Sequence, residues 1–387
     1  MFCGLLEKEQ VIILVTKNDD GTFTIEVDGN KYNTKHNVEM SDDKFHELQS
    51  RFRSKPDFKD VIFDLNGIKQ GSTVYPNIKK YYIFDLQAKV LLTKNRFTIE
   101  DIFENKDLLQ VFYSKIKIND NFFDGGDDYD KILCAMRTAG RPWASKPASF
   151  PIKTVDFILK KYNINNNYYD YSCGWGDRML GSIRNNVNYF GTDPNTILCE
   201  RLNQLKNDYA KYTITQLPKV EINCQGSEIF IPRYYRSMGL AFSSPPYFNL
   251  EDYRIGNQSY KPGDSYEGWL NGFMRETMQN IYEYLIDDGY YALCIKNFDG
   301  LQLEQDSCKL AEDVGFKFIR TETCQIISRV IGDVTRQRKD VLQSNENIYI
   351  FKKDPDRKCQ YHTISDDVDT VSKFAKNVLR AKKKKLF

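Results

Sequence analysis

The pattern of hydrophobic and polar residues divides the chain into two regions. Before about residue 150, strand-like and helix-like stretches follow one another without a regular order. From Ile152 onward, short apolar runs alternate with stretches whose apolar residues recur at helical spacing. Such alternation is typical of a mostly parallel, doubly wound α/β sheet. We therefore predict a Rossmann-like sheet domain that follows an N-terminal α+β domain.

In the N-terminal region, the pattern predicts a hairpin, further strands and one helix. We place the hairpin in residues 11–15 and 22–27, around the turn Asp19-Asp20-Gly21. The other predicted elements are strands at Val61–Asp64 and Tyr81–Phe84 and a helix over Glu100–Tyr113. The acidic segment Asp124–Asp128 is either a domain boundary or a solvated loop. We assign residues 1–130 to this domain, which contains no motif that indicates a function.

The second region contains the elements of the predicted sheet. Its strands are Tyr168–Tyr171, Tyr189–Asp193, Val220–Cys224, Gly239–Phe242, Tyr290–Ile295, Lys317–Thr321 and Glu346–Phe351. Its helices are Lys153–Tyr162, one from about Arg178, and Ile197–Ala210, Tyr266–Leu285 and Glu304–Val314. We place the sheet domain at residues 131–353 and a basic helical tail at 354–387.

The tetrapeptide Ser244-Pro245-Pro246-Tyr247 follows a buried strand and is suited to hold an amine. Its two prolines fix the backbone, so the carbonyls of Ser244 and Pro245 are rigid acceptors. The Ser244 hydroxyl is a further acceptor, and the ring of Tyr247 can stack on a base. Open α/β sheets bind ligands at this end of their strands. An ordinary Pro-Pro turn is the alternative interpretation.

A glycine turn and two acidic residues indicate a nucleoside ligand. Asp170 ends the first strand of the sheet, and Gly174 and Gly176 let the backbone pass close to a ligand. Asp193 ends the next strand, where an acid usually binds ribose hydroxyls. Met179 stands where a dinucleotide-binding turn has its third glycine, which favours a nucleoside without phosphates over NAD. Gln225–Glu228, with Ser227, either borders the adenine ring of this ligand or forms a simple turn.

Four segments, in the expected order over roughly residues 140–353, resemble the nucleic-acid amino-methyltransferases. These enzymes use S-adenosylmethionine to methylate the exocyclic nitrogen of cytosine or adenine. Ser244–Tyr247 resembles their catalytic (D/N/S)PP(Y/F/W) motif, and Asp170-Tyr171-Ser172-Cys173-Gly174-Trp175-Gly176 resembles their cofactor loop. Lys146–Pro151 resembles the segment around the methionine end of the cofactor, and Glu346–Lys353 resembles the final strand.

The resemblance implies a Rossmann-like methyltransferase that binds S-adenosyl-L-methionine and no metal. The catalytic residues it implies are Ser244, Pro245, Pro246 and Tyr247. The cofactor-binding residues that we predict are Asp170, Ser172, Gly174, Gly176, Asp193, Ser227, Lys146 and Phe150. Trp175 and Lys146 depart from the family pattern. The short spacing between the two motifs leaves no room for a target-recognition domain there.

Composition is consistent with a globular protein and gives little information on the partner. The chain has 387 residues, of which 41% are hydrophobic and 28% charged, and no apolar stretch approaches the roughly 20 residues of a membrane helix. Nine cysteines without a CxxC motif and three histidines make a zinc site improbable and indicate an intracellular protein, cytoplasmic or associated with the nucleoid. The net charge of +2 requires that any nucleic-acid contact be local.

We expect methyl transfer to a base in DNA, with nucleic acid as the partner and either a homodimer or association with other subunits. In the enzymes that the motif resembles, serine in the first position is associated with cytosine N4 and Asp or Asn with adenine N6. The resemblance therefore favours cytosine N4 and implies a role in restriction–modification. The loop 249–263 is either a nucleotide clamp or a surface loop. Alternatives for the whole chain are an adenine-N6 or RNA methyltransferase, a non-catalytic nucleic-acid-binding subunit and, more distantly, a dehydrogenase.

Overall fold

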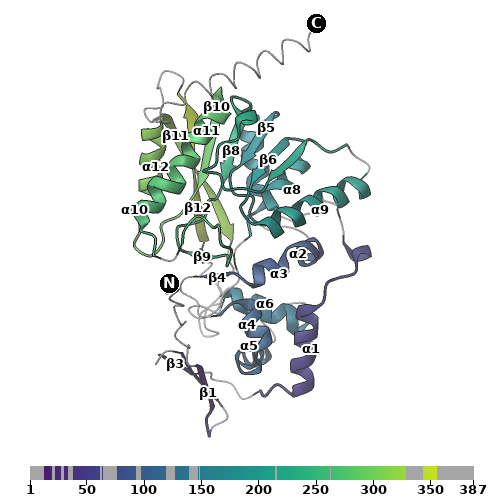
Figure 1. The fold of residues 1–387 in the computed structure, drawn as a ribbon. Helices are drawn as coiled ribbons and strands as arrows, with labels where there is room; N and C mark the ends of the chain where they lie inside the picture. Colours follow the sequence, from purple (N-terminus) through teal and green to yellow (C-terminus); the bar gives the residue numbers. More distant parts are fainter. Residues whose placement is uncertain are drawn as a thin grey trace, which may run out of the picture. The chain divides into compact units, whose positions relative to one another are not determined.

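The computed structural model describes most of the chain (Figure 1). The described residues are 13–19, 22–27, 30–33, 38–61, 63, 76–92, 97–118, 127–138, 147, 149–213, 216–261, 263–327 and 343–354. Lys146 lies outside them, as do residues 124–126 of the acidic segment and the predicted tail beyond residue 354. The predictions made for those residues stay predictions.

The chain forms two compact units, each of which is described by itself. The first contains the described residues within 1–57 and 85–148, and the second contains those within 58–84, 149–329 and 338–387. The predicted boundary at residue 130 falls inside a helix, α6 (Asp128–Thr138). Residues 58–84, which we assigned to the N-terminal domain, belong to the second unit.

The first unit combines a small antiparallel sheet with helices. Strands β1 (Ile13–Lys17), β2 (Phe23–Val27) and β3 (Asn30–Asn33) pair in the order β1-β2-β3, which confirms the predicted hairpin. The predicted helix over 100–113 is divided into α4 (Ile99–Glu104) and α5 (Lys106–Ile118), because the Asn105 side chain accepts the first free N–H groups of α5. The other elements are α1 (Asp42–Arg53) and β4 (Leu91–Leu92).

The predicted strand at Tyr81–Phe84 is wrong, because these residues belong to two short helices and the turn at Ile83 between them. The helices are α2 (Pro76–Tyr82) and α3 (Phe84–Ala88). Ile78 and Tyr82, which are four residues apart, are both buried and lie on one face of a helix. A predicted strand of only four residues is too short to show this helical spacing. Val61 and Phe63 also lie outside any strand, and the remaining two residues of that predicted strand are not described.

The second unit contains a seven-stranded sheet in the order β11-β12-β10-β8-β5-β6-β7 (Figure 1). Its strands are β5 (Asn167–Asp170), β6 (Asn188–Thr192), β7 (Val220–Asn223), β8 (Met238–Ser243), β10 (Leu285–Cys294), β11 (Phe316–Ile327) and β12 (Gln343–Lys353). The strands from β10 to β7 are parallel, whereas β12 is antiparallel to both β10 and β11. The predicted doubly wound, Rossmann-like sheet is confirmed.

Helices connect these strands in the predicted positions. They are α7 (Ile152–Lys161), α8 (Asp177–Arg184), α9 (Thr196–Tyr212), α10 (Tyr266–Trp269), α11 (Arg275–Tyr284) and α12 (Leu303–Val314), with a π-helical turn at Leu270–Met274 between α10 and α11. Short elements complete the unit: the 3-10 turns Phe58–Asp60 and Pro232–Tyr234 and the strand β9 (Glu251–Asp252). No helix among the described residues is both long and apolar enough to cross a membrane.

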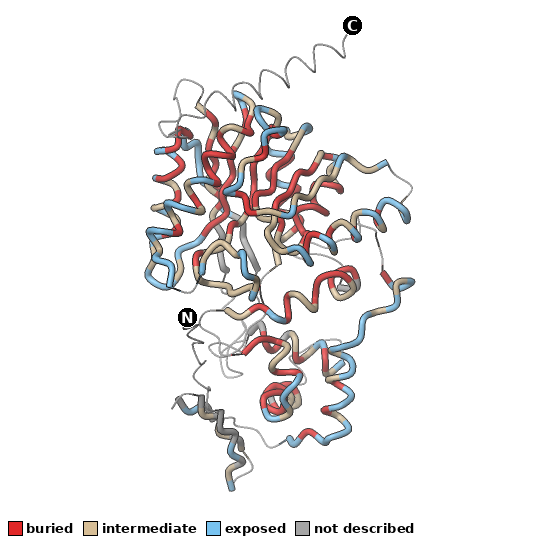
Figure 2. Tube along the Cα trace, in the orientation of Figure 1, coloured by how far each residue is buried: buried red, intermediate tan, exposed pale blue. Residues whose placement is uncertain are grey.

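Alternate side chains of β5 point to opposite faces of the sheet. Tyr169 and Tyr171 pack in the core formed with α11 and α12. Tyr168 and Asp170 point to the other face, where α8 supplies an ion-pair partner for Asp170. Figure 2 shows the strands of this sheet as the most continuously buried part of the unit. The core therefore lies on both faces of the sheet, and the strand ends carry the polar residues.

Replacement of Gly191 by alanine in β6 should destabilise the second unit. A Cβ atom there would lie 2.4 Å from the Cys173 sulfur and 2.8 Å from the Tyr189 ring, so neighbouring atoms must move. Overpacking of this kind costs about 1–3 kcal/mol. Urea unfolding measures the effect, and Gly256→Ala is the control because nothing lies within 4 Å of its added atom. Equal unfolding midpoints for the two variants would contradict the predicted packing.

Candidate active site

The two predicted motifs meet at the carboxyl edge of the parallel strands. After β5 the chain adds β6 and β7 on one side, and later β8 and β10 on the other side. Doubly wound sheets bind ligands at such a switch point. Here the Ser243 hydroxyl, at the end of β8, donates to the Ser172 carbonyl, just after β5, at 3.2 Å. This bond joins the glycine turn to the start of the Ser-Pro-Pro-Tyr motif.

Asp170 forms a buried ion pair with Arg178. Nε of Arg178 lies 3.1 and 3.0 Å from the two carboxylate oxygens, and the Tyr189 hydroxyl donates to one of them at 2.8 Å. The guanidinium also donates to the Ser172 carbonyl. Burial by itself would lower the pKa of Arg178, but the adjacent carboxylate outweighs it and raises that pKa. Asp170 is thus fully engaged within the protein and shapes the turn.

The glycine turn requires both of its glycines. Gly174 has φ 54° and Gly176 has φ 80°, in the left-handed region that side chains disfavour. Gly176 also precedes α8, and a Cβ atom there would lie 2.6 Å from a methyl group of Leu202. Trp175, the bulky departure from the family pattern, is partly exposed and lies with its ring centroid 6.1 Å from that of Tyr253.

Asp193 lies beside this turn, as its spacing predicts. Its carboxylate accepts the N–H of Asn195 at 3.0 Å and also the N–H of Gly174. Burial is the largest effect on the group and, despite those N–H groups, raises the pKa of Asp193 to about 7. Unlike Asp170, it forms no ion pair with any residue that the structure describes. An acceptor in this state is suited to ligand hydroxyl groups.

The other predicted cofactor residues have different environments. The Phe150 ring lies under the Arg178 guanidinium at 5.0 Å and meets Phe242 edge to face. The Ser172 hydroxyl donates to the carbonyl of Tyr171 at 2.7 Å. Ser227 is buried, and its hydroxyl is bonded to that of Thr277 in α11 at 2.9 Å. The Ser227 side chain therefore ties its loop to a helix.

The Ser-Pro-Pro-Tyr motif contains a chain of hydroxyl groups. The Ser244 hydroxyl donates to that of Tyr247 at 3.1 Å, and the Tyr247 hydroxyl donates to the Cys294 carbonyl at 3.4 Å. Because the Ser244 proton points toward Tyr247, the lone pairs of its oxygen are directed elsewhere and can accept from an amine. The Tyr247 ring packs against the hydrophobic core while part of it is exposed.

The loop after the motif reaches back to the cofactor turns. The Asn257 side chain donates to the Pro194 carbonyl at 2.9 Å, next to Asp193. Tyr253 of the same loop meets Trp175 and donates to Glu251. These contacts, like the role of Arg178, were not predicted. An arginine eight residues after the strand-ending acid is the one signal that could have indicated the ion pair.

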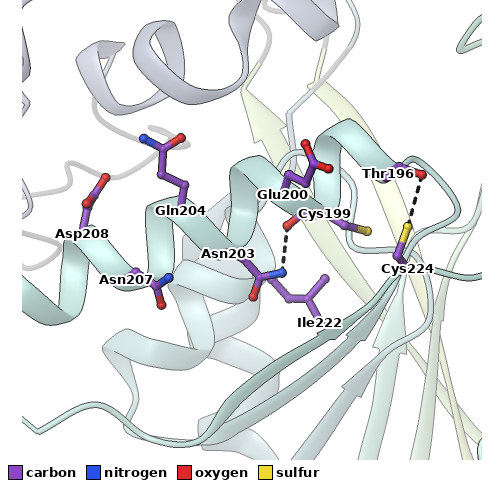
Figure 3. Close-up of a pocket in the computed structure, with 9 residues that line it drawn as sticks. All are labelled: Thr196, Cys199, Glu200, Asn203, Gln204, Asn207, Asp208, Ile222 and Cys224. Atoms are coloured by element: carbon purple, nitrogen blue, oxygen red, sulfur yellow. Dashed lines mark hydrogen bonds between the residues drawn. The ribbon is translucent and has the colours of Figure 1, made fainter.

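A pocket of about 560 Å³ lies along α9 and β7 (Figure 3). Its lining residues are Thr196, Cys199, Glu200, Asn203, Gln204, Asn207, Asp208, Ile222 and Cys224. None of the predicted site residues lines it. Its link to them is Cys199, whose thiol donates to the Asp193 carbonyl at 3.2 Å. We therefore place the candidate active site at the strand ends rather than in this pocket.

No protein-family model matches the sequence, and no curated protein sequence matches it. Similar solved structures include a SAM-dependent O-methyltransferase from Thermotoga maritima (14% identity, TM-score 0.37, 55% of this chain and 69% of that one). TrmN from Thermus thermophilus gives 11% identity and a TM-score of 0.36 over 53% of this chain and 49% of that one. The cyclopropane synthase MmaA2 from Mycobacterium tuberculosis gives 12% and 0.36 over 52% and 84%. Similarity at this level does not assign an activity.

Removal of the Arg178 charge should strongly destabilise the second unit. Arg178→Met leaves the Asp170 carboxylate buried without its cation, and loss of one partner of a buried pair costs about 3–5 kcal/mol. Urea unfolding at pH 7 measures the loss. Adding Asp170→Asn to the same variant removes the stranded charge and should recover part of the stability. A double variant no more stable than Arg178→Met would contradict this account of the pair.

Asp193→Asn should stabilise the protein at high pH. The carboxyl ionises near pH 3.8 when unfolded but near pH 7 when folded, so the wild type loses stability as the pH rises between these values. The asparagine variant has no such loss, and its advantage should approach about 4 kcal/mol at pH 8 and be less than about half of that at pH 5. Urea unfolding at both pH values provides the measurement. An advantage independent of pH would be inconsistent with the raised pKa.

Proposed function

We propose that the second unit is an S-adenosylmethionine-dependent methyltransferase that acts on the exocyclic amine of a base in DNA, with cytosine N4 favoured over adenine N6. The observation that carries this proposal is the Ser243–Ser172 hydrogen bond at the switch point of the sheet. It joins a turn suited to a nucleoside with a motif suited to an amine. Two reacting groups bound there would be neighbours, which is the main requirement of direct transfer.

The residues around the glycine turn fit the cofactor. Asp193 is an acceptor that lacks a cationic partner among the described residues, as expected of a group that binds ribose hydroxyls. Gly174 and Gly176 keep the adjacent backbone free of side chains. The cofactor supplies an electrophilic methyl group on a sulfonium. Asp170, which is neutralised by Arg178, supports the turn and is not itself available as the counter-ion of the cofactor amine.

The Ser-Pro-Pro-Tyr motif supplies the acceptors for the target amine. The amine of a base is a weak nucleophile because its lone pair is delocalised into the ring. Hydrogen bonds from its N–H groups to the Ser244 oxygen and the Pro245 carbonyl favour a more tetrahedral nitrogen and stabilise the positive charge that develops on it. The bond from Ser244 to Tyr247 fixes the serine oxygen as an acceptor. The base must leave its stack to reach these groups.

Activity is tested by incubation of the full chain with isotopically labelled S-adenosylmethionine and DNA, followed by mass spectrometry of the released nucleosides. We expect labelled N4-methylcytosine. Ser244→Ala should lower the rate about 10²-fold, because one acceptor for the developing charge is lost. Ser237→Ala is the matched control, since its hydroxyl donates to the Tyr234 carbonyl on the amino-terminal side of β8.

The products distinguish the proposal from its alternatives. Labelled N6-methyladenine would move the target from cytosine to adenine, and label found in RNA alone would move it from DNA to RNA. A chain that binds S-adenosylmethionine but labels no nucleic acid of either kind would contradict the proposed substrate class. Equal rates for Ser244→Ala and Ser237→Ala would remove Ser244 from the catalytic site.

A further inference from the structure

Helix α2 brings a buried lysine to the first turn of α8. The Lys79 ammonium lies 3.1 Å from an oxygen of Asp177 and donates to the Ser149 hydroxyl. The side chains of Lys79 and Asp177 are only 9% and 2% exposed, so this is a buried ion pair. Asp177 directly follows Gly176 of the glycine turn, and Ser149 precedes Phe150. A residue from the N-terminal third of the chain thus reaches two segments of the candidate site.

Contacts with α9 hold α2 in place independently of Lys79. The Tyr82 hydroxyl donates to Asp208 at 2.7 Å, and the Tyr82 carbonyl accepts from Arg201 at 3.1 Å. Aromatic rings add to this attachment, since the Phe58 ring lies 5.5 Å from that of Tyr81 in α2 and 5.1 Å from that of Tyr212 in α9. Because these bonds do not involve Lys79, its replacement should leave α2 attached to α9.

The lysine ties together the segments that surround the glycine turn. Lys79 donates to both Asp177 and the Ser149 hydroxyl, and Phe150 directly follows Ser149, so both residues lie beside the Lys79–Asp177 pair. The Phe150 ring in turn lies under Arg178, which holds Asp170 and the Ser172 carbonyl. A hydrogen-bonded ion pair, a cation–π contact and a second ion pair therefore link α2 to the end of β5.

The order of the strands indicates which part of the cofactor lies above these residues. Asp193, at the end of β6, would hold the ribose, and the methyl group must face the motif at the end of β8. The strand between them is β5. The amino-acid end of the cofactor would then be held by the turn after β5 and the start of α8. The N-cap residue of α8, Gly176, has no side chain to bind the free N–H groups. A carboxylate is favoured at such a helix start.

We propose that Lys79 is a positioning residue for the amino-acid end of the cofactor, acting through Asp177, Ser149 and Phe150. The proposal rests on the proposed function, because it assumes that the turn binds S-adenosylmethionine. Lys79 holds Ser149 and Phe150 against the first turn of α8, and so fixes the wall that the amino-acid end contacts. It does not itself touch the reacting atoms.

The test compares two ligands that differ in the amino-acid end. S-Adenosylhomocysteine contains it, and 5′-methylthioadenosine lacks most of it while keeping the nucleoside and the sulfur. In calorimetric titrations, Lys79→Met should weaken S-adenosylhomocysteine binding about 10- to 100-fold, because displaced positioning groups have effects of this size. Binding of 5′-methylthioadenosine should stay within about twofold of the wild type.

Two further variants separate this effect from loss of the fold. Lys79→Met combined with Asp177→Asn leaves no buried carboxylate without a cation, so it should fold even if the single variant does not. It should show the same difference between the two ligands. Lys161→Met is the control, because Lys161 forms an ion pair with the buried Glu322 at 2.7 Å in the same unit, although the Lys161 side chain is more exposed than that of Lys79. Its affinities for both ligands should equal those of the wild type.

The outcomes distinguish this inference from the proposed function. A wild-type chain that binds neither ligand overturns the proposed cofactor and, with it, the role of Lys79. A wild-type chain that binds both, with variants that lose the two ligands equally or lose neither, overturns the role of Lys79 alone. Selective loss of S-adenosylhomocysteine binding supports both.

Discussion

The buried ion pair between Asp170 and Arg178 is the interaction on which the candidate site depends. A carboxylate at the end of a central strand cannot remain ionised in the core without a cation. The cation comes from the first turn of α8, so the chain must reverse within a few residues, which the left-handed Gly174 and Gly176 permit. The same guanidinium binds the Ser172 carbonyl, to which the end of β8 is also bonded. One pair thus fixes the turn and its distance from the Ser-Pro-Pro-Tyr motif.

The two strand-ending acids have different environments, although both were predicted to bind the cofactor. Asp170 is satisfied by protein groups and contributes to the architecture. Asp193 has backbone N–H partners but no cation among the described residues, and it remains poorly solvated. A group of this kind lowers the stability of the free protein and gains most when a ligand supplies hydrogen-bond donors. The candidate site therefore combines a rigid turn, in which Asp170 is paired with Arg178, with a second acid, Asp193, that has no cationic partner among the described residues.

The sequence predicted the sheet well because its signals are local. Strands β8 and β10 contain short apolar runs. The rule for parallel strands predicted that Asp193 and the Ser-Pro-Pro-Tyr motif follow strands at the same edge of the sheet. Features that depend on side-chain direction or on distant segments were missed. Ser227 has the expected position, but its hydroxyl is bonded to α11. The run Tyr81–Phe84 was predicted to be a strand. The ion pair between Lys79 of α2 and Asp177 of α8 was therefore not predicted.

The path of the chain has a consequence for how the protein can be divided. All the motifs that resemble the methyltransferases lie after residue 140, so a fragment beginning at residue 131 looks complete when judged by motifs. Such a fragment would omit Phe58–Phe84, which the structure assigns to the sheet unit. It would therefore lack Phe63, which stacks on Tyr212 of α9, and Lys79, which pairs with Asp177 next to the glycine turn. The compact sheet unit is therefore discontinuous in sequence, and its limits follow buried contacts instead of motif boundaries.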